Sequence, residues 1–338
     1  MVEIVEVEPD LIQLRTRRGG WPSSCNVYLI RDGGRSVMVD AGLGVDPSLA
    51  KLLKRMSDAL ALWGHTLRDL RGILLTHTHT DHAGGAMPIA RQTGARVYVP
   101  ARGWAQAADP HWQAHHILPD EVRKELTGHR DTDVVDHFRK KTMPELFASG
   151  AGVEWTLVED GDEIPVGRYR LKAIHLPGHD VAHLAWVDLQ FRLGFTGDLM
   201  TARGTSLPWY PPNAGGVDGY LASLRQLQDL TLQVACPGHG AVCRGAAAVA
   251  DLCEATRRTI LDRDKALLGA LLTGPKSFGE LDDIICDDEV RDVIPWASSV
   301  TMAHLVHLDQ IGVASRLDDG RYVVEPIAAE RHLRQMEN

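Results

Sequence analysis

The most constraining feature of the sequence is a cluster of three histidines and one aspartate within six residues. It lies in LLTHTHTDH, residues 74–82, directly after an apolar run. Side chains two positions apart in an extended segment point to one side, so His77 and His79 can bind one metal ion. Asp81 and His82 can then turn toward a second ion. Imidazole and carboxylate suit Zn²⁺, Fe and Mn, and packing alone does not require such a grouping, so the cluster predicts a metal site.

Four further strand ends carry the same kinds of side chain, each in a turn built with Gly or Pro. SVMVDAG carries Asp40 at the end of a strand, and HLPGH carries His175 and His179. FTGD ends in Asp198, and CPGHG carries His239. Each turn alone is an ordinary loop, but catalytic residues gather at such strand ends. Together with the histidine cluster and in this order along the chain, the segments predict one shared site.

Composition narrows the class of protein. The chain has 338 residues, of which 44% are hydrophobic and 24% charged, with a formal net charge of −9. These values are typical of globular proteins and exclude collagen-like, coiled-coil and disordered chains. No apolar run reaches the roughly 18–20 residues that cross a membrane, and the acidic N-terminus shows no signal peptide. Five cysteines without a C-x-x-C pair argue against disulfides or a zinc ribbon, so we expect a cytoplasmic location.

Short apolar runs alternate with helical segments, which predicts a layered α/β sandwich. Helices are expected at residues 47–63 and 85–93. Strands are expected in two blocks, at residues 5–7, 26–30, 36–39, 73–75 and 97–99, and then at 153–158, 169–174, 182–187, 191–195 and 232–236.

Two segments fall outside this alternation. Residues 101–151 are polar and rich in His and Trp, which predicts a helical insertion that acts as a lid or an interface. Residues 251–338 are expected to form a second domain after a catalytic domain at 1–250. Its predicted elements are helices at 256–272, 277–285 and 298–311, with Ser298 as the cap of the third, and a hairpin around Asp319-Gly320. Three helices followed by a hairpin form a winged-helix-like arrangement.

The ordered motifs resemble those of the metallo-β-lactamase-fold hydrolases. The matching segments are Asp40, HTHTDH, the PGH that ends at His179, the GD that ends at Asp198 and the PGHG around His239. The resemblance covers about the first 250 residues. It implies a four-layer αββα sandwich with two Zn²⁺ ions at one edge, while Fe or Mn would fit the same ligands.

The resemblance also implies a role for each side chain. One ion would be bound by His77, His79 and His179, and the second by Asp81, His82 and His239; Asp198 would bridge both, and Asp40 would support the site from behind the ligands. Asp81 and Asp198 are the residues expected to act in catalysis.

The details of the motifs point to particular branches of the family. A carboxylate bridge looks more like the glyoxalase II and ribonuclease branches than like the antibiotic-degrading ones. The C-terminal segment and the pattern H-x-P-G-H-x-x-x-H, here His175, His179 and His183, resemble the β-lactamase-like protein 2 subgroup. We therefore expect His175 and His183 either to orient the ligands through hydrogen bonds or to be ordinary core histidines.

A two-metal site of this kind predicts a hydrolase whose nucleophile is a hydroxide that bridges the metals, because metal binding lowers the pKa of water to about 7. We expect a small acyl substrate, foremost a thioester or ester such as an acyl-CoA. A lactonase or β-lactamase is a further option. The alternative is a metal-dependent endoribonuclease or phosphodiesterase, since a winged helix can bind nucleic acid. Charge disfavours it, because residues 251–338 hold 10 Lys and Arg against 17 Asp and Glu.

Aromatic side chains in two loops could form an apolar wall for the acyl group. They are Trp104 and Trp112 in the insertion, and Trp209 and Tyr210 after the bridging aspartate. In the other interpretation, the aromatics of the insertion pack on one another in a lid or a homodimer interface. The expected partner is a small acyl compound, with nucleic acid and membranes disfavoured.

Overall fold

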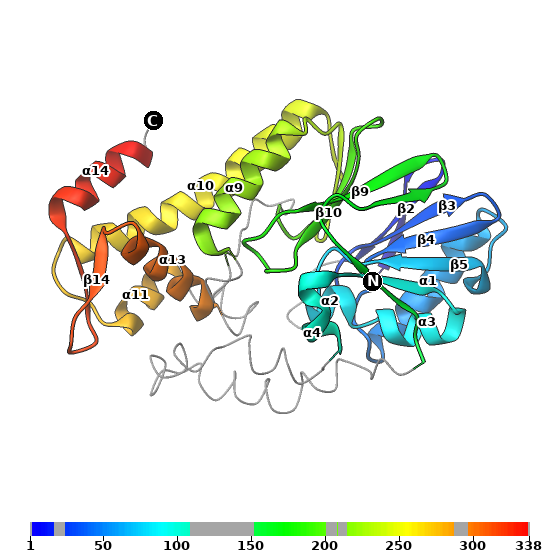
Figure 1. Cartoon of the computed structure of the whole chain (residues 1–338), viewed down its shortest axis with the longest axis horizontal. Coiled ribbons are helices and arrows are strands. Elements are labelled where there is room, and N and C mark those ends of the chain that lie inside the picture. Colours follow the sequence, from blue (N-terminus) through cyan, green and yellow to red (C-terminus); the bar gives the residue numbers. More distant parts are fainter. Residues whose placement is uncertain are drawn as a thin grey trace.

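Two β-sheets lie face to face in the larger part of the molecule (Figure 1). The computed structural model describes residues 2–16, 24–108, 152–200, 208, 215–286 and 297–336. The first sheet runs in order from β1 to β7: Val2–Glu8, Leu11–Thr16, Val27–Asp32, Arg35–Val39, Leu70–Leu74, Arg96–Pro100 and Trp155–Val158. The second has the order β13-β12-β11-β10-β9-β8; from β8 to β13 its strands are Glu163–Val166, Tyr169–His175, Leu184–Asp188, Leu193–Gly197, Val234–Pro237 and Cys243–Arg244.

Three hydrophobic clusters separate four layers. Between the sheets, side chains of both meet, as where the rings of Tyr28 and Phe195 lie 5.2 Å apart edge to face. Helices α1 (Ser48–Ala61) and α3 (Ala86–Thr93) cover the outer face of the first sheet. Helix α9 (Gly216–Asp229) and the first half of α10 (Ala246–Leu271) cover the outer face of the second. The predicted αββα sandwich is confirmed, and burial on both faces explains why strands such as β4 and β11 are apolar runs.

The direction of the strands determines where the site lies. Strands β4, β5, β6 and β7 pair in parallel, and so do β11 and β12. Strand β9 is antiparallel to β10, which is antiparallel to β11, so β9 and β11 run the same way. The carboxyl ends of parallel strands meet at one edge of a sheet, where ligands bind in open α/β folds. The predicted motifs all follow such carboxyl ends.

The C-terminal part has its own core and shares helix α10 with the sandwich. The 26-residue helix places Val249, Cys253 and Ile260 in the sandwich cluster and Leu267, Leu268 and Leu271 in the C-terminal cluster (Figure 1). The predicted boundary at residue 250 falls inside this helix. The other elements are α11 (Phe278–Ile285), α13 (Ser298–Gln310), β14 (Ala314–Arg316), β15 (Tyr322–Val324) and α14 (Pro326–Met336). Their order matches the prediction, except that α14 follows the hairpin and was not predicted.

Helix α13 is buried on most of its surface. Ten of its 13 residues are buried, including Ser298, Thr301 and His304. The prediction that Ser298 caps this helix is wrong, because Ala297 occupies the cap position. The Ser298 hydroxyl instead donates to a buried carboxylate oxygen of Asp282 on α11, at 2.8 Å. The serine is needed for helix–helix packing, which competes with capping for the same side chain.

Part of the insertion lies within the described residues. Strand β6 leads into a short helix, α4 (Trp104–Ala108), and the description resumes at residue 152 before β7. The helical content predicted for 109–151 lies outside the described residues. Among the helices of the described ranges, none is both long and apolar enough to cross a bilayer.

Candidate metal centre

All seven predicted metal ligands lie at one edge of the sandwich. Strand β5 leads into them, the loop after β9 adds one, and the ends of β11 and β12 add two more. The ligand atoms fall into two groups, and within each group they lie within 4.8 Å of one another. The three-histidine group is His77, His79 and His179, and the carboxylate group is Asp81, His82, Asp198 and His239.

In the three-histidine group, ring nitrogens converge on one point. The Nε2 atom of His77 lies 3.1 Å from Nδ1 of His79, and Nε2 of His179 lies 3.0 Å from the same Nδ1. His77 is fully buried, and His179 is 4% exposed. Three imidazole nitrogens directed at one point from two loops form the type of site that binds Zn²⁺.

In the carboxylate group, imidazoles face carboxylates. Nε2 of His239 lies 3.2 Å from Oδ2 of Asp81 and 3.3 Å from Oδ2 of Asp198. Nε2 of His82 lies 3.3 Å from Oδ1 of Asp198. Asp198 Oδ2 is also 3.8 Å from Nε2 of His179, so this carboxylate lies between the two groups.

Two orphaned atoms show that the residues fit divalent cations. Within the described structure, His82 Nε2 and Asp198 Oδ1 are buried and have no hydrogen-bond partner. A buried polar atom without a partner costs about 1–3 kcal/mol, and more when it is charged. A cation bound by both atoms would remove this cost. Nitrogen and carboxylate donors of this kind suit Zn²⁺, with Fe and Mn as further candidates.

Asp40 holds His82 in place from behind. Its Oδ2 lies 2.8 Å from His82 Nδ1, and its Oδ1 accepts from the backbone amide of Thr76 at 2.8 Å. The Thr76 hydroxyl donates to the same carboxylate and lies 3.0 Å from His77 Nδ1. Asp40 has a φ of +56°, which is costly for a residue other than Gly and persists where the surroundings impose it. An imidazole whose Nδ1 proton is held by a carboxylate presents the lone pair of Nε2 to a metal.

A family comparison agrees with this geometry. A model described as the metallo-beta-lactamase superfamily matches residues 20–239, which is more than half of the chain and includes Asp40 and all seven ligands. The chain belongs to the metallo-beta-lactamase superfamily. The predicted family is therefore confirmed.

The superfamily relatives include thioesterases. An atrochrysone carboxyl ACP thioesterase of Aspergillus fumigatus is 26% identical over 227 residues, which are 67% of this chain but only 40% of that protein. The acyl-coenzyme A thioesterase MBLAC2 of Homo sapiens is 25% identical over 221 residues, or 63% of this chain and 72% of that protein. Membership and these relatives support the prediction of a hydrolase.

Solved structures of the superfamily extend the match into the C-terminal part. A metallo-beta-lactamase family protein from Thermus thermophilus has a TM-score of 0.76 at 26% identity and covers 94% of this chain and 100% of that chain. A beta-lactamase domain protein from Burkholderia ambifaria has a TM-score of 0.72 at 19% identity and covers 96% and 95%. The second shows the fold alone.

At this edge of the sandwich, the two ligand groups differ in the pKa values of their histidines. Burial lowers the pKa of both His79 and His179 to about 4, and it lowers the pKa of His77 well below its usual value. Burial also opposes protonation of His239, but Asp198 and Asp81 outweigh it and raise its pKa to about 9. Burial likewise opposes protonation of His82, but the carboxylates of Asp198 and Asp40 outweigh it and raise the pKa of this histidine. At neutral pH the three-histidine group therefore offers neutral ligands, whereas the carboxylate group holds protons that a cation must displace.

His183 and His175 support the site through the backbone. His183 Nε2 accepts from the backbone amide of Asp198 at 3.1 Å, which fixes the loop that carries this carboxylate. His175 Nε2 donates to the carbonyl oxygen of Val181 at 2.9 Å, within the loop that also carries His179. Neither ring orients a ligand side chain through these bonds; both act on the loops that carry the ligands.

Two glycines of the motifs are required by close approach. A Cβ on Gly238 would collide with Oδ1 of Asp198 and with the ring of His82. Gly178 has a φ of +131°, and a Cβ there would collide with the backbone of Tyr220 on α9. The Tyr220 hydroxyl donates to the carbonyl oxygens of Leu199, at 2.6 Å, and Asp198, at 3.0 Å. The PGH and PGHG motifs thus fit against the loop of Asp198.

Several residues at the site were not predicted from the sequence. Thr76 and Tyr220 bond to the site as described, and Asp180, 3% exposed, places Oδ2 3.4 Å from His79 Nε2. The sequence contained one signal for Asp180, an acidic residue directly after a ligand histidine. Cys25 is also buried against Asp40 and His82, and burial raises the pKa of its thiol to about 12, so it is protonated at neutral pH.

Of the predicted aromatic wall, Trp104 alone lies within the described residues. Its ring stands edge to face with that of Trp155 on β7, at 5.3 Å between centroids. The structure thus gives Trp104 a packing partner on the first sheet and does not bring it into either ligand group. Trp112, Trp209 and Tyr210 lie outside the described residues.

Proposed function

We propose that this protein hydrolyses acyl thioesters with two divalent cations, Zn²⁺ in the first place, held by the three-histidine group and the carboxylate group. The observation that carries the proposal is the pair of ligand atoms without hydrogen-bond partners, His82 Nε2 and Asp198 Oδ1, within one cluster of potential metal ligands. Two such cations, when bound, lower the pKa of water toward neutrality and polarise the carbonyl group under attack.

The side chains of the protein hold this arrangement rigid. Asp198 lies between the groups, with Oδ1 3.3 Å from His82 Nε2 and Oδ2 3.8 Å from His179 Nε2, so its carboxylate would serve both. Asp40 and His183 hold His82 and the Asp198 loop from behind, at 2.8 and 3.1 Å. Ligands that are held in place before the reaction do not have to reorganise during it. Such preorganised electrostatic stabilisation of the transition state is the largest contribution to the rate enhancement of many enzymes.

Asp81 is the group best placed to receive the proton of the attacking water. Its side chain is 20% exposed, against 13% for Asp198 and for His239. Burial opposes ionisation, but His82 and His239 outweigh it and lower the pKa of Asp81, so its carboxylate is ionised at neutral pH. A thiolate leaving group departs without needing a proton, since thiol pKa values lie near 8.5.

Thioesters are favoured as substrates by the relatives. The two named above are an acyl-coenzyme A thioesterase and a carboxyl ACP thioesterase, and both names describe the hydrolysis of a thioester. Solved metallo-beta-lactamases of subclass B3 match with a TM-score of 0.51 at 18% identity, which reflects the fold alone. A lactone or β-lactam is therefore ranked behind a thioester.

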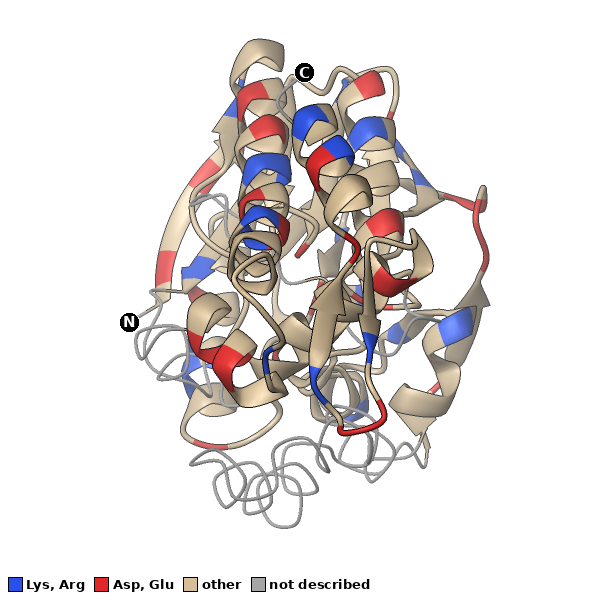
Figure 2. Cartoon of the chain, turned by 90° about the vertical axis from the view of Figure 1, so that its left-hand side faces the viewer, with Lys and Arg blue, Asp and Glu red and all other residues tan. Residues whose placement is uncertain are grey.

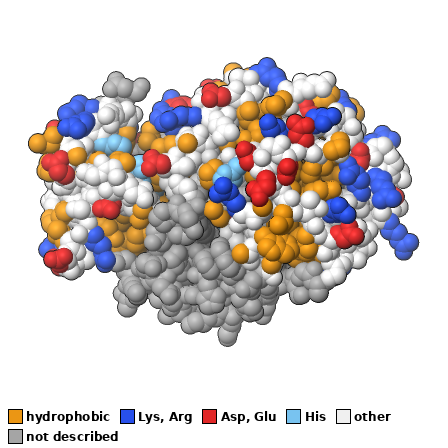
Figure 3. All heavy atoms as spheres, viewed as in Figure 1, with side chains coloured by type: hydrophobic (Ala, Val, Ile, Leu, Met, Phe, Trp, Pro, Cys, Tyr) orange, Lys and Arg blue, Asp and Glu red, His pale blue; other side chains and the backbone are white. Residues whose placement is uncertain are grey.

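The C-terminal part does not favour nucleic acid. The helix that a winged-helix protein would insert into a groove, α13, buries ten of its 13 residues and packs on α9, α10 and α11. Asp319 at the turn of the hairpin pairs with Arg321, and acidic residues form that turn (Figure 2). On the face drawn in Figure 3, basic and acidic side chains of this part are interspersed. We infer that it is a packing module, and a homodimer and a cytoplasmic location stay predictions.

A substrate panel tests the proposal. Protein loaded with Zn²⁺ is offered acyl-CoA thioesters of several chain lengths, an acyl carrier protein thioester, aryl esters, lactones, β-lactams and RNA. We expect kcat/KM to be highest for a thioester, with free thiol released in proportion to acid. Faster cleavage of RNA that is lost in Asp81→Ala would replace this proposal by the nuclease alternative.

A pair of matched variants distinguishes the loss of a metal ligand from the loss of packing around a buried histidine. His77→Ala removes a buried ligand histidine, whereas His65→Ala removes a buried histidine bonded to Ser36 at 2.8 Å, away from the ligands. Both lose packing, and only the first should lose thioester hydrolysis. Equal activity of the two variants would refute the ligand assignment.

A further inference from the structure

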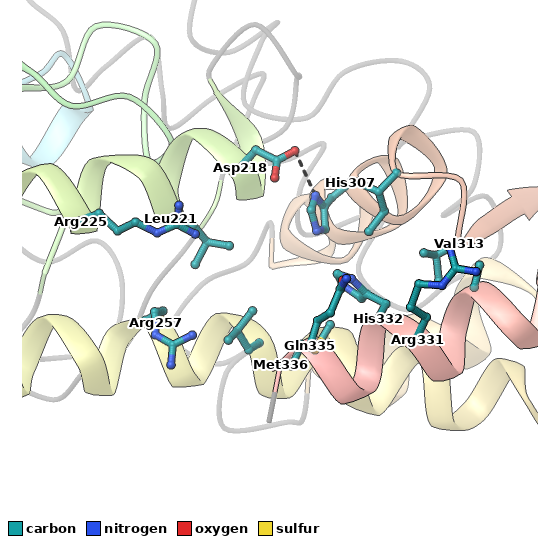
Figure 4. A pocket seen from close by; sticks show the side chains of 13 residues that line it. Asp218, Leu221, Arg225, Arg257, His307, Val313, Arg331, His332, Gln335 and Met336 are labelled. Atoms are coloured by element: carbon teal, nitrogen blue, oxygen red, sulfur yellow. Dashed lines mark hydrogen bonds and ion pairs between the residues drawn. The ribbon is translucent and has the colours of Figure 1, made fainter. Parts of the chain in front are cut away.

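A second polar site lies between the sandwich and the C-terminal part. A pocket of about 510 Å³ opens between α9, α10, α13 and α14 (Figure 4). His307 projects into it from α13 toward α14, which carries His332, and the two ring centroids are 6.1 Å apart. Asp264 of α10, which is fully buried, lies with its Oδ2 3.6 Å from Nε2 of His307. These three side chains each offer a ligand atom, and the atoms lie within 4.8 Å of one another.

The hydrogen bonds around these residues leave acceptor atoms facing one another. His307 Nδ1 lies 3.2 Å from Oδ2 of Asp218 on α9, and when the ring proton is on this nitrogen, Nε2 carries the lone pair (Figure 4). Yet Nε2 of His307 faces Oδ2 of Asp264 at 3.6 Å. That distance is too long for a hydrogen bond. In that tautomer, the lone pair of Nε2 and the carboxylate oxygen of Asp264 face each other, which is unfavourable unless a cation lies between them.

Two atoms of this cluster lack partners. Among the described residues, Asp264 Oδ2 and His332 Nε2 are buried and accept or donate no hydrogen bond. The other oxygen of Asp264, Oδ1, lies 2.7 Å from Nδ1 of His304, which fixes the orientation of the carboxylate. The cluster therefore resembles the metal centre described above in one respect. In both, a carboxylate lies against Nδ1 of a histidine, Asp40 at His82 and Asp218 at His307, and Nε2 of the same ring faces other potential metal ligands.

We propose that Asp264, His307 and His332 bind one further divalent cation of the Zn²⁺ type, with Asp218 orienting His307. Two imidazoles and one carboxylate form a ligand set that Zn²⁺ and Fe²⁺ accept, and three protein ligands leave a position for water. Of the nearby arginines, Arg257 is paired with Glu254 at 2.7 Å, and Arg225 and Arg331 are exposed and screened. Burial lowers the pKa of the half-buried Arg263, and its interaction with Asp264 opposes this shift.

Such a cation would fasten the C-terminal part to the sandwich. Its ligands come from α10, α13 and α14, and Asp218 adds α9. Asp218 lies two residues before Tyr220, whose hydroxyl bonds to the loop of Asp198. The inference is independent of the proposed hydrolysis, because it concerns different residues and a structural effect.

A metal count on paired variants tests the site. His332→Ala removes a half-buried ligand, and Gln335→Ala truncates a neighbour on the same helix and in the same pocket that offers no ligand atom to the cluster. Each protein is stripped with a chelator, reloaded with Zn²⁺, freed of excess metal and analysed by atomic emission. We expect His332→Ala to hold one equivalent less per chain than Gln335→Ala and the wild type. Equal zinc contents would overturn the proposal.

The difference between the variants does not depend on the catalytic edge. If the dinuclear assignment failed, the total zinc content would be lower in all three proteins, but the difference of one equivalent would remain. Asp264→Asn serves as a second variant and should show the same loss.

Hydrogen exchange of the whole chain gives a readout apart from the metal count. Added Zn²⁺ should slow amide exchange in α14 in the wild type and in Gln335→Ala, and not in His332→Ala. Protection of α14 to the same extent in His332→Ala would also overturn the proposal.

Discussion

Both ligand groups at the catalytic edge contain histidines and lie a few ångströms apart, yet the pKa values of these histidines are shifted in opposite directions. In the three-histidine group, burial lowers the pKa of His79 and His179 to about 4. In the carboxylate group, Asp198 and Asp81 overcome burial and raise the pKa of His239 to about 9. The difference shows that adjacent carboxylates, and not burial itself, decide whether an imidazole is a free ligand or holds a proton.

The difference in protonation changes how a metal ion would bind to each group. A cation that enters the three-histidine group at neutral pH meets neutral nitrogens and displaces no proton from them. A cation that enters the carboxylate group must displace protons from His82 and His239, but it gains the negative charge of two carboxylates. The predictions below test the difference between the groups, beginning with the residue that they share.

The largest effect is expected for Asp198→Ala, because this carboxylate faces both groups. We expect thioester hydrolysis to fall by about 10³-fold or more, which corresponds to roughly 4 kcal/mol of the barrier. Bound zinc should decrease more than in His77→Ala or His239→Ala, each of which damages one group. The exposed Asp251→Ala is the matched control and should retain activity. Full zinc content in Asp198→Ala would mean that the groups do not share it.

Asp40→Asn should weaken the carboxylate group selectively. Asp40 contacts Nδ1 of His82 at 2.8 Å, and loss of such a partner typically lowers metal affinity by about 10–100-fold. We expect one of the two zinc affinities to fall in a competition with a chromophoric chelator and the other to stay within about threefold. Asp188→Asn is the control, since Asp188 is a buried carboxylate that accepts from the amides of Arg170 and Phe191. If both affinities fell equally, the groups would not be separable in this way.

The stability of the metal-free protein should fall on both sides of neutral pH, with a different group responsible on each side. His79 and His179 have folded pKa values near 4, below the unfolded value of about 6.5, so their contribution is lost as pH falls from 6.5 toward 4. His239 has a folded pKa near 9, so its contribution is lost as pH rises from 6.5 toward 9.

Melting temperatures of chelated protein between pH 5 and 9 check this expectation. His79→Gln should flatten the acid side of the profile, and His239→Gln should flatten the alkaline side. A profile that changes on the same side in both variants would contradict the opposite protonation of the two groups.

The smallest effect is expected for Tyr220→Phe. The lost hydroxyl donates to Leu199 and Asp198, so the free energy of unfolding should fall by about 0.5–1.5 kcal/mol in urea titrations. Zinc affinity should change by less than about tenfold, and both groups should be affected alike because the loop of Asp198 serves both. Tyr169→Phe removes a similar bond, to Asp10 at 2.8 Å, and should lose stability without a change in zinc affinity.

Much of the site could be predicted because each ligand sits in a short motif. A strand end followed by Gly, Pro, His or Asp is visible in a single sequence, and the parallel strands then bring these ends together. The supporting contacts could not be predicted in this way. Tyr220 is 22 residues from Asp198 along the chain and looks like any core tyrosine of an amphipathic helix, because its role depends on how α9 packs.

In the fold, too, the features that depend on local sequence patterns could be predicted, and those that depend on tertiary packing could not. The strands and the order of the C-terminal elements follow from local patterns, whereas the role of Ser298 does not. A serine before an apolar helical run is an ordinary capping signal, and only the packing of α11 brings Asp282 within 2.8 Å of it. The pairing of His307 with Asp264, 43 positions earlier in the chain, likewise depends on the crossing of α13 over α10.

Helix α10 has a consequence for how the chain gains and loses its structure. At about 1.5 Å per residue, its 26 residues span roughly 39 Å, and one end belongs to the sandwich core while the other belongs to the C-terminal core. Because both cores pack on this one helix, the loss of either core removes contacts that stabilise it, and we expect the two cores to denature in a single cooperative transition. An enzyme built this way cannot be divided into modules at the join, and any exchange of its C-terminal part in evolution or in engineering must carry the helix with it.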